Sequence, residues 1–128
     1  MKILVVDDEM PIRELLRHKL SRVGFEVSTA RNGHEFMNFA MEQKPDLIIL
    51  DIWLNQGLGP DVYHELLERG FSKDVPVIFI TALVEGRSGN GQIFPGQKYS
   101  LFSKPFNFEK LIKEIQGLLN FTENQKSN

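Results

Sequence analysis

The chain has 128 residues, about the length of one ordinary domain, which leaves no room for a second hydrophobic core. With 41% hydrophobic and 25% charged residues and a formal charge of -2, it is neither disordered nor basic enough to favour direct binding to nucleic acid. The absence of cysteine excludes disulfides, thiol catalysis and cysteine-ligated zinc, and the lack of a long apolar run or signal peptide predicts a cytoplasmic protein without membrane insertion.

The first part of the chain alternates predicted strands with predicted helices. Residues 3–6 form an apolar run without polar alternation, which indicates a strand covered on both faces. A helix with one apolar face follows and ends at Gly24, and residues 26–30 form a second strand. Asn32, with a glutamate three positions later, has the spacing of a capping box and begins a helix that Pro45 closes.

The same alternation continues through the middle of the chain. Residues 47–50 and 77–80 are two further apolar runs of the kind that fully buried strands show. Between them, Pro60 suits the first turn of a helix and Gly70 suits its end. Strands that alternate with helices in this way predict an α/β domain with a parallel sheet covered by helices on both faces.

The last third of the chain breaks the alternation before it ends in a helix. Residues 82–100 are rich in glycine and show no helical face, so we expect a long loop, which is either a functional surface or a misassigned element. A short strand is predicted at residues 99–102, and residues 108–119 have the clearest amphipathic pattern in the chain. We expect residues 1–121 to form the domain and residues 122–128 to be a polar, frayed tail.

Polar side chains follow the ends of the predicted strands. They are Asp7, Asp8, Glu9, Asp51, Thr81, Ser103 and Lys104. The carboxyl ends of parallel strands meet at one edge of an open sheet, where ligands bind, so these groups should lie together. Clustered carboxylates repel one another unless a cation neutralises them, and oxygen ligands select Mg²⁺, with Mn²⁺ as a substitute. An aspartate beside Mg²⁺, a hydroxyl and a lysine has the groups that phosphoryl transfer requires and would form aspartyl phosphate.

Four motifs in order resemble those of a known family. They are the pair Asp7-Asp8, the segment DIWLNQGLG that begins at Asp51, the pair Thr81-Ala82, and Lys104-Pro105-Phe106. Together they resemble the receiver domains of bacterial two-component response regulators, of the chemotaxis-regulator type. The resemblance implies a flavodoxin-like, doubly wound, five-stranded parallel sheet of order 2-1-3-4-5.

The resemblance also implies a role for each matching residue. Asp51 is the expected phospho-acceptor, Asp8 a direct Mg²⁺ ligand, and Asp7 an acid that helps to hold the metal through water. Asp51 itself and the backbone carbonyl of Trp53 complete the expected metal site. Thr81 and Lys104 are expected to bind the phosphoryl group, with a cis peptide bond at Lys104-Pro105.

The sequence departs from the family pattern at several positions. Leu101 stands where many receivers have a switch aromatic, and Tyr99 and Phe102 lie nearby at the wrong offset unless a bulge shifts the register. Asn55 replaces the usual proline, and residues 82–100 occupy the place of the fourth helix, which we expect to be short, irregular or replaced by a loop. The sequence therefore lacks the usual aromatic partner of a threonine-aromatic relay, and ordering or loosening of this loop is an alternative switch.

The residue types at two positions predict that spontaneous hydrolysis of the phosphoryl group on Asp51 is slow for a receiver. Trp53 lies two positions after the acceptor and Leu83 two positions after the threonine, beside the expected path of hydrolytic water. Neither side chain can orient a water molecule for attack.

The predicted function is acceptance of a phosphoryl group on Asp51 from a sensor histidine kinase or a histidine phosphotransfer protein, followed by conformational signalling. Such a domain assists its own phosphorylation and dephosphorylation but is not a conventional turnover enzyme. The further partner is a downstream protein or a missing output domain, since the chain is either a stand-alone regulator or a fragment of a longer one.

Two alternatives remain. One is a receiver-like binding module that signals without phosphate, which Leu101 and the unusual loop favour. The other is an aspartate-nucleophile phosphatase of the haloacid dehalogenase type, whose signature requires a second aspartate two positions after the nucleophile. Here that position is Trp53, so the signature fails.

Overall fold

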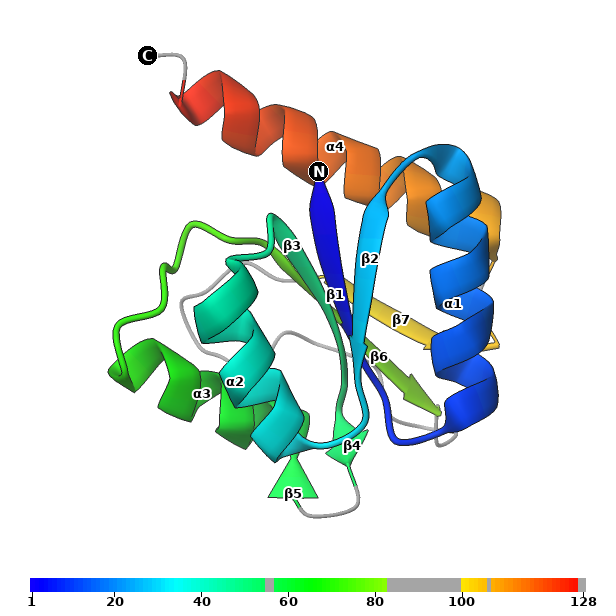
Figure 1. Cartoon of the computed structure of the whole chain (residues 1–128). Helices are drawn as coiled ribbons and strands as arrows, with labels where there is room; N and C mark the ends of the chain where they lie inside the picture. Colours follow the sequence, from blue (N-terminus) through cyan, green and yellow to red (C-terminus); the bar gives the residue numbers. More distant parts are fainter. Residues whose placement is uncertain (55–56, 83–99, 106, 127–128) are drawn as a thin grey trace.

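The computed structural model describes residues 1–54, 57–82, 100–105 and 107–126. Five parallel strands form one sheet between two layers of helices (Figure 1). The strands are β1 (Lys2–Val6), β2 (Glu26–Ala30), β3 (Leu47–Asp51), β6 (Val77–Ala82) and β7 (Ser100–Lys104). Their order across the sheet is β2-β1-β3-β6-β7, and every neighbouring pair is parallel. The predicted sheet, including its strand order, is confirmed.

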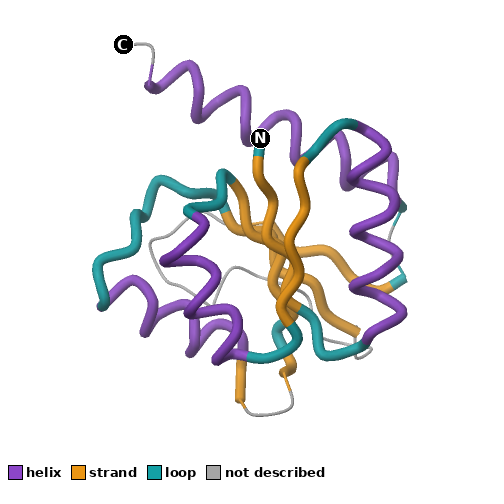
Figure 2. Tube along the Cα trace, in the orientation of Figure 1, coloured by secondary structure: helices purple, strands orange, loops and turns teal. Residues whose placement is uncertain are grey.

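The helices cover both faces of this sheet. They are α1 (Met10–Val23), α2 (Gly33–Gln43), α3 (Gly59–Glu68) and α4 (Phe108–Lys126). Helices α2 and α3 lie on one face and α1 and α4 on the other, with the strands between them (Figure 2). Successive residues of β3 point to opposite faces, so Ile48 and Leu50 join one apolar cluster while Leu47 and Ile49 join the other. Burial on both faces explains why the strands lack polar alternation.

Most helix boundaries lie where the sequence predicts them. Gly24 ends α1 in the left-handed conformation at φ 112°, which favours glycine because it has no Cβ. Asn32 Oδ1 accepts a hydrogen bond of 2.8 Å from the Glu35 backbone N–H at the start of α2. The Glu35 carboxylate in turn accepts a bond of 3.0 Å from the backbone N–H of Arg31, one residue before the cap. The predicted capping pair is therefore present, with its return bond shifted by one residue.

Two features differ from the sequence predictions. A two-residue antiparallel pair joins β4 (Trp53–Leu54) to β5 (Gly57–Leu58), and such short strands have no periodicity to detect. Helix α4 continues to Lys126, through part of the segment expected to fray. No glycine or proline follows Gly117 in the sequence, so nothing there stops the helix.

Strand β7 has a regular register. It pairs with β6 without a bulge, from Ile78 opposite Ser100 to Ala82 opposite Lys104. Leu101 packs toward the cluster under α2 and α3, and Phe102 packs toward the cluster under α1 and α4. Since neighbouring residues of a strand face opposite sides, Phe102 does not take the place of Leu101.

Some sequence predictions cannot be compared with the fold. Residues 83–99 of the expected loop, which include Leu83 and Tyr99, lie outside the described residues. Asn55 lies outside them as well. Within the described part of the chain, no helix is both long enough and apolar enough to cross a membrane.

Candidate functional site

The strand ends bring the predicted site residues to one edge of the sheet. Asp7 directly follows β1, Asp51 is the last residue of β3, and Lys104 is the last residue of β7. Asp7, Asp51 and Thr81 have only 0%, 3% and 9% of their surface exposed, and they are the buried polar or charged residues of the described chain. Burial of a polar side chain is costly unless a partner compensates it. The concentration of such residues at one edge therefore indicates a functional site.

Lys104 stands at the centre of the carboxylates. Its Nζ lies 2.7 Å from Asp7 Oδ2, 2.9 Å from Glu9 Oε2 and 3.2 Å from Asp51 Oδ2. Burial alone lowers the pKa of Lys104, but these carboxylates outweigh burial and raise the pKa above its ordinary value. Lys104 therefore stays positively charged. Its peptide bond to Pro105 is cis, as the family resemblance implies.

Asp7 is held by backbone contacts that orient its carboxylate. Its Oδ1 accepts a hydrogen bond of 2.9 Å from the backbone N–H of Glu9. The guanidinium of Arg13 donates a bond of 2.8 Å to the Asp7 backbone carbonyl. Asp7 Oδ2 is buried and faces Lys104 as an ion pair, yet it has no directed hydrogen bond within the described part of the chain. An oxygen in this state is suited to a further cationic partner.

Asp51 has one backbone partner and one charged partner. Its Oδ1 accepts a bond of 3.1 Å from the Trp53 backbone N–H, and its Oδ2 accepts one of 3.2 Å from Lys104. Burial and then the negative charge of Asp7 raise the pKa of Asp51 from 3.8 to about 7, although Lys104 opposes this rise. Burial also raises the pKa of Asp7, more than Lys104 lowers it. Each carboxylate would gain from additional positive charge nearby.

The acidic residues have the composition and spacing of a site for a hard cation. Asp7, Asp8 and Asp51 each offer one carboxylate oxygen, and these oxygens lie within 4.8 Å of one another. Oxygen ligands of this kind suit Mg²⁺, which binds through a few carboxylates and keeps several waters. Two further observations favour a cation at this site. Asp7 Oδ2 is buried without a directed hydrogen bond within the described residues, and the pKa of Asp51 is raised. The residues present therefore fit a divalent cation.

Thr81 lies near the end of β6 with a loosely held hydroxyl. Its Oγ1 donates to the backbone carbonyl of Ala82 at 3.4 Å, a long and weak hydrogen bond. Little energy is therefore needed to turn this hydroxyl toward another acceptor.

The sequence places Glu9 among the polar groups at the strand ends without predicting a role for it, and it predicts no site role for Arg13 or Gly59. Glu9 contacts Lys104, Arg13 holds the Asp7 carbonyl, and Gly59 packs against the backbone of Asp51. For Arg13 the sequence holds a weak indication of a role, since a basic residue near the start of a helix is unfavourable with the helix dipole and therefore needs another reason to be there. The other two contacts join residues from different elements and leave no local pattern.

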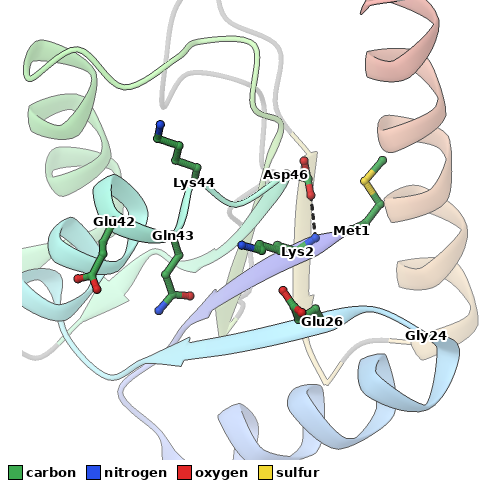
Figure 3. A pocket seen from close by; sticks show the side chains of 8 residues that line it. All are labelled: Met1, Lys2, Gly24, Glu26, Glu42, Gln43, Lys44 and Asp46. Carbon is green, nitrogen blue, oxygen red and sulfur yellow. Dashed lines mark hydrogen bonds between the residues drawn. The ribbon is translucent and has the colours of Figure 1, made fainter.

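A shallow hollow lies at the opposite edge of the sheet, where β1 and β2 begin (Figure 3). It has a volume of about 730 Å³ and contains none of the predicted site residues. Its lining residues are Met1, Lys2, Gly24, Glu26, Glu42, Gln43, Lys44 and Asp46. None of these side chains is buried, and the backbone N–H of Lys2 already donates to Asp46 at 2.7 Å. The buried charged side chains of the described residues therefore lie at the carboxyl ends of the strands and not in this hollow.

Relatives of the chain are transcriptional and response regulators. It is 37% identical over 124 residues to the "Probable transcriptional regulator ycf27" of Cyanophora paradoxa, covering 96% of this chain and 50% of that protein. It is 33% identical over 122 residues to the response regulator MprA of Mycobacterium tuberculosis, covering 95% of this chain and 52% of that protein. The chain thus spans about half the length of the curated relatives it matches.

Solved structures show the same architecture. The chemotaxis protein CheY4 of Vibrio cholerae has a TM-score of 0.81 and 29% identity, covering 91% of this chain and 97% of that one. The response regulator TrrA of Thermotoga maritima, crystallised in complex with Mg²⁺-BeF, has a TM-score of 0.75 and 36% identity, again with 91% and 97% covered.

The family model of the response regulator receiver domain matches residues 3–116. Receiver domains of this family are generally not conventional enzymes, and they interact with histidine kinases and output domains. Nothing in these comparisons favours a phosphatase or a phosphate-independent module. The chain belongs to the response regulator receiver domain family of two-component systems.

Proposed function

We propose that this receiver domain accepts a phosphoryl group on the carboxylate of Asp51. The observation that carries the proposal is the position of that carboxylate. It is buried at the end of β3, 3.2 Å from the Lys104 ammonium and beside the carboxylates of Asp7 and Asp8. A nucleophilic oxygen, a fixed cation and a cation-binding acidic cluster are the components of phosphoryl transfer.

The transfer itself exchanges one bond for another. An oxygen of Asp51 forms a bond to the phosphorus while the bond from phosphorus to the donor nitrogen of a phosphohistidine breaks. The leaving imidazole keeps the electron pair and takes up a proton. Lys104 pairs with the negative charge on the phosphoryl oxygens, and the hydroxyl of Thr81 turns from Ala82 toward one of them.

Asp7, Asp8 and Asp51, together with the backbone carbonyl of Trp53, are the residues proposed to hold Mg²⁺, or Mn²⁺ in its place. Bound there, the cation neutralises charge on the phosphoryl oxygens. Asp7 Oδ2, which is buried and accepts no directed hydrogen bond within the described residues, would be the oxygen that accepts a hydrogen bond from a water on the cation. The backbone bonds from Glu9 to Asp7 and from Trp53 to Asp51 keep both carboxylates in place without the cation.

The proposed donors are a sensor histidine kinase or a histidine phosphotransfer protein, and the domain assists its own phosphorylation and dephosphorylation. Its signal passes to a downstream protein or to an output domain, and it needs no direct contact with nucleic acid. A cytoplasmic location and a domain boundary near residue 121 are part of the same proposal.

The test is incubation with acetyl phosphate and Mg²⁺, followed by intact-mass measurement. In this reaction acetate leaves in place of the imidazole. We expect a single adduct of one phosphoryl group on the wild type and none on Asp51→Asn. Continuous release of phosphate without an adduct would indicate a phosphatase, and the absence of both would indicate a phosphate-independent module.

A further inference from the structure

Glu9 is a third acidic partner of Lys104, supplied by the residue just before α1. Its Oε2 lies 2.9 Å from Lys104 Nζ and accepts a hydrogen bond from it. The backbone carbonyl of Glu9 also accepts bonds of 3.1 Å from Ile12 and Arg13, so its main chain is fixed at the start of the helix. The Glu9 carboxylate therefore reaches Lys104 from a backbone position that is fixed.

The ammonium group of Lys104 is shared among three carboxylates: it donates hydrogen bonds to Glu9 and Asp51 and forms an ion pair with Asp7. An ammonium group has three N–H donors, and the carboxylates of Asp7, Glu9 and Asp51 all face it within 3.2 Å. A phosphoryl group on Asp51 needs the same ammonium to balance its new charge. The carboxylates around Lys104 therefore compete with the phosphoryl group for this ammonium when the group arrives.

Glu9 is the partner that can leave most easily. Its side chain is 58% exposed, whereas that of Asp7 is 0% exposed and that of Asp51 is 5% exposed. A carboxylate that turns toward water regains its hydration, but a buried carboxylate loses its compensation without a substitute. The exchange of partners at Lys104 is therefore expected at Glu9.

Charge adds to this competition. The site already gathers the carboxyl groups of Asp7, Glu9 and Asp51 around the Lys104 ammonium, and the Asp8 carboxyl lies close to those of Asp7 and Asp51. A phosphoryl group brings further negative charge close to all of them. Removing the charge of Glu9 relieves repulsion and releases a donor of Lys104, while the three acids of the proposed metal site stay in place.

We infer that Glu9 is a resting-state competitor of the phosphoryl group, an inference that rests on the proposed function of Asp51. It occupies Lys104 in the unmodified domain and thereby weakens binding of phosphoryl groups at the site. Glu9 is a positioning residue in this account, because it acts through Lys104 and not on the reacting atoms.

The experiment compares wild type, Glu9→Gln and the control Glu14→Gln at saturating Mg²⁺. Glu14 is the same residue type on α1, and its exposed carboxylate pairs with Arg17 at 2.7 Å and not with Lys104. Beryllofluoride serves as the phosphoryl mimic, and its binding is followed by the fluorescence of Trp53, the single tryptophan of the chain. Phosphorylation by acetyl phosphate is followed in parallel by intact mass.

We expect Glu9→Gln to bind beryllofluoride about two- to fivefold more tightly, the range of a partly exposed ion pair, and Glu14→Gln to match the wild type. The Mg²⁺ affinity of Glu9→Gln should change little, and its melting curve checks that it folds. Glu9→Ala should act in the same direction and carries the test if Glu9→Gln is unfolded.

Two results would overturn the inference and leave the proposed function intact. One is equal beryllofluoride affinity in all proteins. The other is a loss of Mg²⁺ affinity of about tenfold or more without tighter beryllofluoride binding, which would make Glu9 a metal ligand. Failure of the wild type both to bind beryllofluoride and to form an adduct would overturn the proposed function as well.

Discussion

Gly59 packs directly against the backbone of Asp51. The first residue of α3 lies so close to the end of β3 that a Cβ at Gly59 would overlap the Asp51 carbonyl oxygen and would stand 3.1 Å from Leu50 Cγ. The Gly59 N–H also donates a bond of 2.7 Å to the carbonyl of Ile52. The start of α3 therefore helps to fix the strand end that carries the proposed phospho-acceptor.

Gly59→Ala should both destabilise the domain and disturb the site. The added methyl group meets rigid backbone, so we expect a loss of about 1–3 kcal/mol in the free energy of unfolding. Gly117→Ala is the control, because nothing lies within 4 Å of a Cβ there and alanine favours a helix by about 0.5–1 kcal/mol. Urea unfolding measures both changes. Equal stability of the two variants would contradict the close packing at Gly59.

The buried carboxylate of Asp51 makes the metal-free domain less stable as the pH rises. Its folded-state pKa of about 7 lies above the ordinary value of 3.8, so the protonated form is favoured in the folded state. Its contribution to stability is therefore complete below about pH 4 and is lost as the pH rises through about 7. The raised pKa of Lys104 acts only in the alkaline range and does not change this window.

Asp51→Asn should remove the part of this pH dependence that comes from Asp51, while the raised pKa of Asp7 leaves a smaller change in the same direction. Without Mg²⁺ we expect the variant to be more stable than the wild type at pH 8, by on the order of 1–3 kcal/mol, and to differ less at pH 5. Asp74→Asn changes an exposed aspartate and should follow the wild type at both values. The measurement is chemical unfolding in EDTA. A gap between wild type and Asp51→Asn that is as large at pH 5 as at pH 8 would contradict the assignment.

Mg²⁺ should stabilise the wild-type domain through the acidic cluster. At a concentration about 100 times its dissociation constant, the gain is about 2.7 kcal/mol. Asp8→Asn removes one oxygen ligand and should lose most of this gain at the same concentration, while Asp46→Asn at the opposite edge of the sheet should retain it. Melting curves with Mg²⁺ and with EDTA measure the difference. Full stabilisation of Asp8→Asn would place the ion elsewhere.

Trp53 should keep the phosphoryl group on Asp51 for a long time. Its side chain is 52% exposed beside the acceptor and has no group that can orient a water for attack. Trp53→Asn supplies an amide that can do so, and one added hydrogen bond of about 1 kcal/mol would speed hydrolysis about fivefold. Loss of the adduct is followed by intact mass after removal of acetyl phosphate.

Trp53→Leu is the matched control, because it opens the same space without adding a hydrogen-bonding group. It should decay at the wild-type rate. Equal acceleration in both variants would show that shielding by the indole matters and not the orientation of water.

The positions of Asp7, Asp51 and Thr81 could be predicted from the sequence. Each follows or ends a short apolar run, and such runs indicate parallel strands buried on both faces. Once the strands are parallel, their carboxyl ends must share an edge of the sheet. Convergence of the acids therefore followed from the pattern, and the contacts of Lys104 in the structure agree with it.

The capping pair at Asn32 and the helix end at Gly24 were also readable, since both depend on neighbours along the chain. The two-residue strands β4 and β5 could not be predicted, because they are too short to show any periodicity. The extension of α4 to Lys126 could not be predicted either, because the sequence there has no apolar periodicity.

The sequence by itself determined the fold class and the edge at which the chemistry lies, because hydrophobic periodicity and turn residues encode local structure, while the order of the strands came from the resemblance of its motifs to receiver domains. Only the tertiary structure decided that Glu9 contacts Lys104, that Gly59 must lack a side chain beside Asp51, and that Phe102 faces away from the side of Leu101. These relationships join elements that are distant along the chain. They depend on helix placement and strand register to within an ångström or two, and no local pattern of residues carries that information.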